Sequence, residues 1–284
     1  MLNKLTHAST LRVEIEGFKK TARSQPNKNI QEKVLQISLH NPKARNAINT
    51  IMLDELNNCL DDLSKKKEIR ILIITGEGQA FSAGADLEWM KQSINLTLEE
   101  NKNDALKFSK MLRKIDEFYC TTIAIINGHA FGGGLGLLSV CDFKIADSKS
   151  KFCFSEVKLG IIPAMIGPYI LRNLGYTNTK KLFLTGEIFN ADEAATINLI
   201  DKFVSTTDII NERNILINKL LLGGPKAQTA IKAYLQNIYS KSISDDVISY
   251  AAEKIADLRV SEEGQKGIKA FLNKGNPDWQ NDIS

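Results

Sequence analysis

The chain has 284 residues, of which 43% are hydrophobic, and its formal net charge at pH 7 is +4. This length predicts one hydrophobic core with an appendage rather than two independent units. The small positive excess is interleaved with Asp and Glu, which argues against a nucleic-acid partner, and no segment approaches the roughly 20 apolar residues of a membrane span.

Cysteine usage and the first residues indicate the compartment. The cysteines are Cys59, Cys120, Cys141 and Cys153. They have no CxxC spacing, and each lies in or beside an apolar run, which is typical of reduced, packed thiols. Residues 1–20 include Glu14 and Glu16 and no continuous apolar stretch, so we expect no signal peptide. Together these features predict a cytoplasmic protein.

Strand and helix patterns alternate over residues 1–205. In chain order the predicted elements are a strand at 34–39, a helix at 52–63, a strand at 71–75, a helix at 105–115 and a strand at 122–126. The strands are continuously apolar, which indicates burial on both faces. Thr97 and Glu100 have the spacing of a capping box before the second helix. This succession predicts an α/β core.

The sequence pattern changes at about residue 206. Helical patterns follow at 209–222, 227–239, 243–256 and 262–272. Gly223, Gly224 and Pro225 and several polar turns break them. Residues 206–284 therefore form a predicted all-helical region, which either packs against the core or covers a neighbouring subunit.

Two glycine-rich loops carry the strongest chemical signal. Residues 81–87 follow a predicted strand and leave the Ala85 amide unshielded, while Gly132 to Gly134 follow another strand and open onto an apolar run. Two such N–H groups can form an oxyanion hole for an acyl carbonyl. The second loop fails the GxGxxG pattern, and close backbone packing is its alternative explanation. Asp86 fits a helix cap better than a catalytic role.

Glu156 is the candidate proton carrier. It lies in the apolar segment 152–163, where loss of hydration would raise the pKa of a carboxyl group toward neutrality. The alternative is a surface glutamate paired with Lys158. His129 is expected to be packed and hydrogen-bonded rather than catalytic. Trp89 and Tyr169 suit either an acyl pocket or the core, and no cluster has metal-ligand spacing.

Taken together, these segments resemble the enoyl-CoA hydratase/isomerase superfamily, also called the crotonase family. The resemblance begins at residues 41–48, includes both glycine loops and Glu156, and reaches residues 271–274. It implies a spiral of ββα units whose C-terminal helices assemble trimers or hexamers. It also implies an acyl-CoA substrate, with coenzyme A entering as part of the thioester and no permanently bound cofactor.

The resemblance assigns residues by position. The implied oxyanion donors are the backbone N–H groups of Ala85 and Gly133, beside Glu156. The implied coenzyme A contacts are Lys43, Ala44, Arg45, Ala83, Asp86 and Leu87, with Phe271 and Lys274 reaching the adenine end from a neighbouring subunit.

One position departs from the family pattern. Typical hydratases carry a first catalytic Glu where this chain has Gly136, so thioester binding is a safer expectation than hydration. The Gly-Leu-Gly-Leu run of the triplet region and residues 155–169 resemble a bacterial subgroup assigned to methylglutaconyl-CoA and related branched glutaconyl-CoA substrates. We expect reversible hydration of a 2-enoyl-CoA. The alternatives are a Δ3,Δ2-enoyl-CoA isomerase with Glu156 as its single base, and a non-catalytic acyl-CoA binder.

Overall fold

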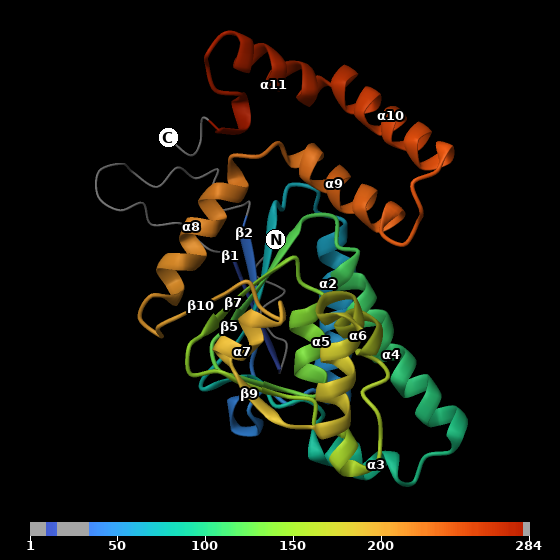
Figure 1. Cartoon of the computed structure of the whole chain (residues 1–284). Helices are drawn as coiled ribbons and strands as arrows, with labels where there is room; N and C mark the ends of the chain where they lie inside the picture. Colours follow the sequence, from blue (N-terminus) through green and yellow to red (C-terminus); the bar gives the residue numbers. More distant parts are fainter. Residues whose placement is uncertain (1–9, 16–33, 281–284) are drawn as a thin grey trace.

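The computed structural model of the chain describes residues 10–15 and 34–280. Two sheets form its centre (Figure 1), one of six strands in the order β1-β2-β3-β5-β7-β10 and one of four in the order β4-β6-β8-β9. The first contains β1 (Leu11–Ile15), β2 (Val34–Leu39), β3 (Ile71–Gly76), β5 (Thr121–Ile126), β7 (Phe143–Asp147) and β10 (Lys202–Val204). The second contains β4 (Ala80–Ser82), β6 (His129–Phe131), β8 (Lys151–Cys153) and β9 (Ile188–Asn190).

The chain winds through both sheets in a repeated order. Strand β3 of the larger sheet leads to β4 of the smaller one, β5 leads to β6, and β7 leads to β8. Neighbours within these two series pair in parallel, whereas β1 and β9 pair antiparallel at the edges. Such winding produces a spiral of strand pairs and helices, which confirms the predicted α/β spiral fold.

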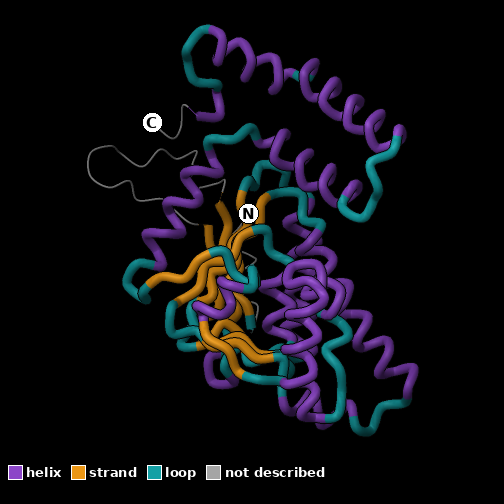
Figure 2. Tube along the Cα trace, viewed as in Figure 1, coloured by secondary structure: helices purple, strands orange, loops and turns teal. Residues whose placement is uncertain are grey.

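Helices cover both faces of the larger sheet (Figure 2). The helices of the core are α2 (Thr50–Ser64), α3 (Leu87–Ser93), α4 (Leu98–Asp116), α5 (Gly133–Ser139), α6 (Gly167–Thr185) and α7 (Ala191–Thr196). Alternate residues of β3 face opposite ways: Leu72 and Ile74 join the cluster built with α2, α4 and α5, whereas Ile71 and Ile73 pack with α8 (Ile209–Leu221). Burial on both faces explains why the strand sequences are continuously apolar.

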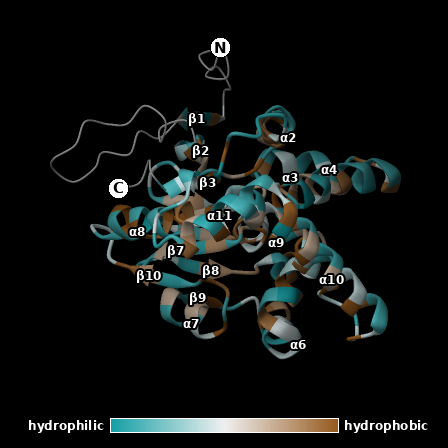
Figure 3. Cartoon of the chain, turned by 90° about the horizontal axis from the view of Figure 1, so that it is seen from above, coloured by the Kyte–Doolittle hydropathy of each residue, from teal (hydrophilic) through white to brown (hydrophobic). Residues whose placement is uncertain are grey.

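The C-terminal helices leave the core progressively. After α8 come α9 (Pro225–Ile238), α10 (Asp245–Val260) and α11 (Glu262–Leu272). Lys232 of α9 reaches Asp142 at 2.7 Å, and no residue of α9, α10 or α11 is buried. Figure 3 shows hydrophobic residues along α10. Assembly of trimers or hexamers through these helices stays a prediction.

The cysteines are packed, as the sequence predicts. All four cysteines are buried and free of disulfides. Burial raises the pKa of the Cys59, Cys120 and Cys141 thiols to about 12, which is typical of packed thiols that keep their protons. Within residues 10–15 and 34–280, no helix is long and apolar enough to cross a membrane.

Helix α4 begins at the predicted capping box. The Thr97 hydroxyl accepts from the Glu100 N–H at 3.3 Å, and the Glu100 carboxylate accepts from the Thr97 N–H at 2.8 Å. Replacing Thr97 with Ala should lower the free energy of unfolding by about 1 kcal/mol, measured by urea titration. Thr97→Ser, which keeps the hydroxyl, is the control. Equal stability of Thr97→Ala and wild type would contradict a role for the cap.

Candidate active site

Three segments distant in sequence line one cavity of about 300 Å³. Ala85 comes from the loop after β4, Gly133 from the start of α5, and Glu156 from the segment after β8. Apolar side chains form most of the wall, including those of Leu87, Trp89, Met90, Phe108, Ile162 and Ile166. Glu156 is the only titratable side chain among the described residues that line this cavity.

The direction of the Ala85 N–H follows from its peptide plane. The Gly84 carbonyl, in the same plane, accepts from the Ile48 N–H at 2.7 Å, and the Asp86 N–H donates to the Ile48 carbonyl at 2.9 Å. No peptide bond of the described chain is cis. Because a trans peptide points its C=O and N–H in opposite directions, the Ala85 N–H points away from the Ile48 backbone. No described residue accepts a hydrogen bond from it.

The glycine triplet presents a second free N–H. The Gly132 N–H donates to the Cys153 carbonyl at 3.0 Å, and the Gly132 carbonyl accepts from the Leu135 N–H at 2.9 Å. The Gly133 N–H, opposite that carbonyl in one peptide plane, therefore points out of the start of α5. Gly132 has a φ of +48°, a conformation that favours glycine.

The two loops approach closely. A Cβ atom added to Gly84 would lie 3.4 Å from the Gly133 nitrogen and 2.7 Å from the Phe131 carbonyl oxygen. Gly84 also has a φ of +90°. Position 84 therefore requires glycine, because a Cβ would overlap the Phe131 carbonyl oxygen and because φ is positive. With glycine at this position, the Ala85 loop can pack against the start of α5.

Glu156 faces the glycine triplet from a short 3-10 helix, Glu156–Leu159. Its Oε1 atom lies 3.2 Å from where a Cβ on Gly132 would be, and its Oε2 atom is buried without a hydrogen-bond partner. Burial raises the pKa of this carboxyl group. Glu156 is partly buried and its Oε2 atom has no partner among the described residues, so the alternative of a surface glutamate paired with Lys158 is wrong.

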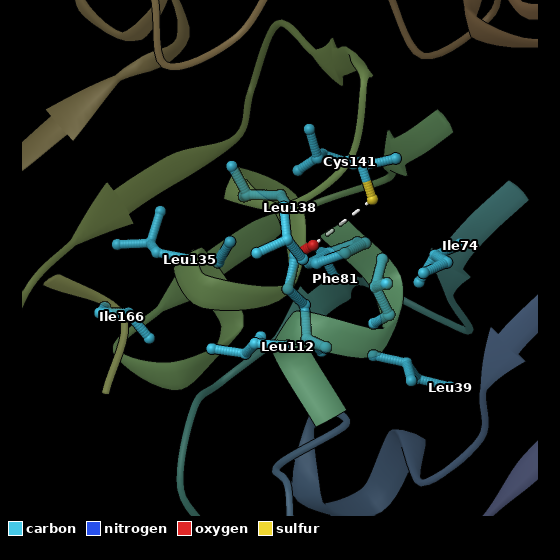
Figure 4. Packing of buried hydrophobic residues seen from close by; sticks show 14 of the residues in the cluster. Leu39, Ile74, Phe81, Leu112, Leu135, Leu138, Cys141 and Ile166 are labelled. Carbon is cyan, nitrogen blue, oxygen red and sulfur yellow. Dashed lines mark hydrogen bonds between the residues drawn. The ribbon is translucent and has the colours of Figure 1, made fainter. Parts of the chain in front are cut away.

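An apolar contact fills the space beside Gly136. A Cβ on this glycine would meet Ile166 Cγ2 at 2.3 Å and Leu112 Cδ1 at 3.4 Å. Figure 4 shows Leu112 and Ile166 beside the core residues Leu135 and Leu138 of α5. Gly136 stands where the family pattern has its first glutamate. In this chain, Ile166 and Leu112 pack around the position, and Glu156 is the one carboxyl group among the described residues that line the cavity.

A second hollow, of about 450 Å³, adjoins the first at Ala83, which lines both. Lys43, Arg45 and His129 are among its lining residues. The His129 ring is exposed, accepts from the Lys151 N–H at 3.1 Å and stacks on Phe131. The predicted hydrogen bonding of His129 is confirmed, but its predicted packing is wrong because the ring lies at the surface.

The remaining candidates occupy different places. Ala44 lies in the 3-10 helix Pro42–Ala44 and lines neither hollow. The Asp86 carboxylate caps α3 by accepting from the Glu88 and Trp89 N–H groups, as predicted. Phe271, 82% exposed, and Lys274 lie at the end of α11 and line neither hollow, so their contact with a neighbour's coenzyme A stays a prediction.

One of the two aromatic candidates lines the cavity, and two further lining residues were not predicted. Trp89 lines the cavity, packs against the core and donates its indole N–H to Asp104. Tyr169 packs against the core and does not line the cavity. Ile166 and Phe108 also line the cavity, although neither stood out among the apolar residues around it. Helical spacing marks Phe108 as buried, but it cannot show which buried residues border a cavity. Groups of three or more His, Cys, Asp or Glu suited to a metal are absent from the part of the chain that the structure describes.

The raised pKa of Glu156 predicts a pH-dependent stability difference. The folded state holds this proton more tightly than the unfolded state, so the stabilisation is full below the unfolded pKa and is lost as pH rises through the folded pKa. Glu156→Gln cannot ionise. It should therefore exceed wild type in free energy of unfolding at about pH 8, and the gap should narrow at about pH 5 in urea titrations. An unchanged gap would contradict the raised pKa, and Glu117→Gln, at an exposed position, is the control.

The contact beside Gly136 predicts coupled stability effects. Gly136→Ala should cost about 1–3 kcal/mol, because its Cβ overlaps Ile166. Combining it with Ile166→Ala should recover part of that loss, giving a cost below the sum of the two single changes in urea unfolding. Additive costs would contradict the contact.

The comparisons with known proteins agree with this architecture. The family model described as Enoyl-CoA hydratase/isomerase matches residues 29–282. A crotonyl-CoA hydratase of Syntrophomonas wolfei is 33% identical over 86% of this chain and 93% of its own. A short-chain-enoyl-CoA hydratase of Clostridium acetobutylicum is 30% identical over 85% and 92%. The crystal structure of an enoyl-CoA hydratase from Shewanella pealeana, 32% identical, superposes with a TM-score of 0.89 over 98% of each chain. The chain therefore belongs to the enoyl-CoA hydratase/isomerase family.

Proposed function

We propose that this protein catalyses the reversible hydration of a 2-enoyl-CoA thioester. The observation that carries the proposal is the Glu156 carboxyl group, which lies against the glycine triplet with one oxygen buried and unpaired. Ala85 and Gly133 line the same cavity and have N–H groups without an acceptor among the described residues. The names of the Syntrophomonas and Clostridium relatives, both hydratases, also support this reaction.

The thioester oxygen would accept from the Ala85 and Gly133 N–H groups. As water attacks, the double-bond electrons move toward the carbonyl and the oxygen becomes enolate-like. Fixed donors stabilise this charge more strongly than they stabilise the neutral ground state. Each donor of this kind contributes roughly 3 kcal/mol to lowering the barrier.

Glu156 would serve as base and then as acid. The carboxylate takes one proton from water while the water oxygen bonds to C3, and the resulting carboxylic acid gives that proton to C2 of the enolate. One carboxyl group thus balances the reaction without a second. A pKa raised by burial favours this exchange, because the carboxyl both accepts and releases the proton readily near neutrality.

The two hollows suggest how the substrate lies. Lys43 and Arg45 border the second hollow and would face the phosphates of coenzyme A, with Ala83 and Leu87 near the thioester end. None of the described residues lining the first cavity is cationic, so this cavity favours an uncharged acyl group. A methylglutaconyl group would have to leave its distal carboxylate in solvent or against a neighbouring copy. Coenzyme A enters only as part of the substrate.

We also propose that the two parts of the chain have different roles. Residues 1–205 would form the spiral core that holds the site. Within residues 206–284, α8 packs on the larger sheet, and the helices that follow it would assemble copies into a trimer or hexamer. Ile248 and Ile255 of α10 and Ile268 and Phe271 of α11 are exposed, and burial of such apolar side chains between copies would stabilise this assembly.

Isomerisation is the second candidate. The packing of Ile166 over Gly136 favours it, because one base suffices to move a proton from C2 of a 3-enoyl-CoA to C4. The same enolate and the same donors would be used. A non-catalytic acyl-CoA binder is the third possibility, and the unpaired Glu156 carboxyl argues against it.

The activity test compares three substrates with the purified protein. Hydration should remove the conjugated thioester absorbance of crotonyl-CoA, isomerisation should create it from a 3-enoyl-CoA, and methylglutaconyl-CoA tests the charged acyl group. Glu156→Gln should lower turnover at least roughly 10²-fold with little change in substrate affinity. Glu117→Gln, exposed at the end of α4, should retain wild-type rates.

The outcomes separate the candidates. Loss of crotonyl-CoA absorbance that depends on Glu156 supports hydration. Activity on the 3-enoyl-CoA alone would replace hydration by isomerisation. Binding without turnover, or wild-type rates in Glu156→Gln, would overturn the proposed mechanism.

A further inference from the structure

A hydrogen-bonded brace lies behind the Ala85 loop, outside the cavity. Its centre is Asn46, which is fully buried and has a φ of +55°. The Asn46 amide nitrogen donates to the carbonyls of Glu77 and Ala80, both at 2.8 Å, and its amide oxygen accepts from the Asn41 N–H at 2.9 Å. One side chain therefore ties the 41–46 segment to the turn between β3 and β4.

Ser82 extends this brace toward the candidate oxyanion hole. Its buried hydroxyl donates to the Asn46 carbonyl at 2.8 Å and accepts from the Gly84 N–H at 3.3 Å. Ser82 also packs tightly against Gly134, since a Cβ on that glycine would meet Ser82 Cβ at 2.9 Å. The hydroxyl thus joins the chain before Ile48 to the residue before Ala85.

The brace ends on the peptide plane that carries the Ala85 N–H. Ile48 holds the Gly84 carbonyl and the Asp86 N–H, and this clamp fixes the tilt of the plane. Asn46 lies two residues before Ile48, and Ser82 lies two residues before Gly84. The Ser82 hydroxyl links the two sides of the clamp, because it donates to the Asn46 carbonyl and accepts from the Gly84 N–H. None of the described residues lining the cavity is Asn46 or Ser82, so neither would touch substrate.

We propose that Asn46 and Ser82 are positioning residues that aim the Ala85 N–H at the thioester oxygen. The inference rests on the proposed oxyanion role of Ala85. It follows from sensitivity to geometry, because a hydrogen bond weakens steeply as its angle departs from linearity and small misplacements reduce rates strongly. Loosening the brace should therefore act on the transition state more than on substrate binding.

Ser82→Ala and Asn46→Gly test this role. Ala removes the bridging hydroxyl at little change in volume, and Gly accepts the positive φ of position 46. Each should lower kcat for crotonyl-CoA roughly 10-fold while KM stays within about 2-fold. Ser150→Ala is the matched control, because its hydroxyl is also buried and donates to the Ile126 carbonyl outside the site. It should leave kcat unchanged.

A vibrational readout separates positioning from general loss of stability. Bound butyryl-CoA labelled with ¹³C at the carbonyl cannot react by hydration, and its C=O stretch reports polarisation by the donors. The band should lie below its position in water in wild type and in Ser150→Ala. In Ser82→Ala and Asn46→Gly it should shift back toward the free position.

The experiment distinguishes a failure of the proposed oxyanion hole from a failure of the positioning role alone. A wild-type band at the free position would overturn the oxyanion role of Ala85 and Gly133, and this inference with it. A displaced wild-type band that does not move in either variant, with kcat unchanged, would overturn the positioning role alone. If Ser82→Ala does not fold, Ser82→Cys keeps a slightly larger side chain of the same shape with a weaker donor and acceptor, and should give an intermediate band and rate.

Discussion

The backbone of Ile48 imposes the constraint on which the candidate site depends. Its N–H and C=O hold the residues on either side of Ala85, at 2.7 Å and 2.9 Å. Because the peptide is planar, holding the Gly84 carbonyl also sets the direction of the Ala85 N–H. The same logic applies at Gly132, whose carbonyl is fixed by Leu135 and whose plane carries the Gly133 N–H. The donors are thus aimed by the fold itself before substrate arrives.

Apolar packing around these donors determines which groups can take part in the reaction. Ile166 covers Gly136, and the lining of the cavity supplies one carboxyl group, Glu156. In surroundings of low polarity, a fixed N–H stabilises developing negative charge more strongly than it would in water. The same surroundings disfavour the charged carboxylate relative to the neutral carboxylic acid. The same burial that strengthens the donors therefore raises the pKa of Glu156 and suits it to carrying a proton.

The sequence was sufficient for the elements that have a strong local signal. The continuous apolar strand 71–75 is buried on both faces in β3, and the Thr97 box begins α4 as predicted. The three-residue strands of the smaller sheet were not predicted, because so short a run has no period to detect. The sequence singled out the glycine loops and Glu156 because small residues and a carboxyl group stand out in apolar segments, and these three segments line one cavity. Ile166 was not singled out, because a contact across 30 positions with a glycine leaves no pattern in a single sequence.

The most direct measurement is a structure of the protein with an unreactive acyl-CoA bound in the cavity. The account predicts that the thioester oxygen lies about 2.7–3.1 Å from the nitrogens of both Ala85 and Gly133, with the acyl carbons beside Glu156. A thioester oxygen that accepts from neither nitrogen, or an acyl chain bound outside this cavity, would contradict it.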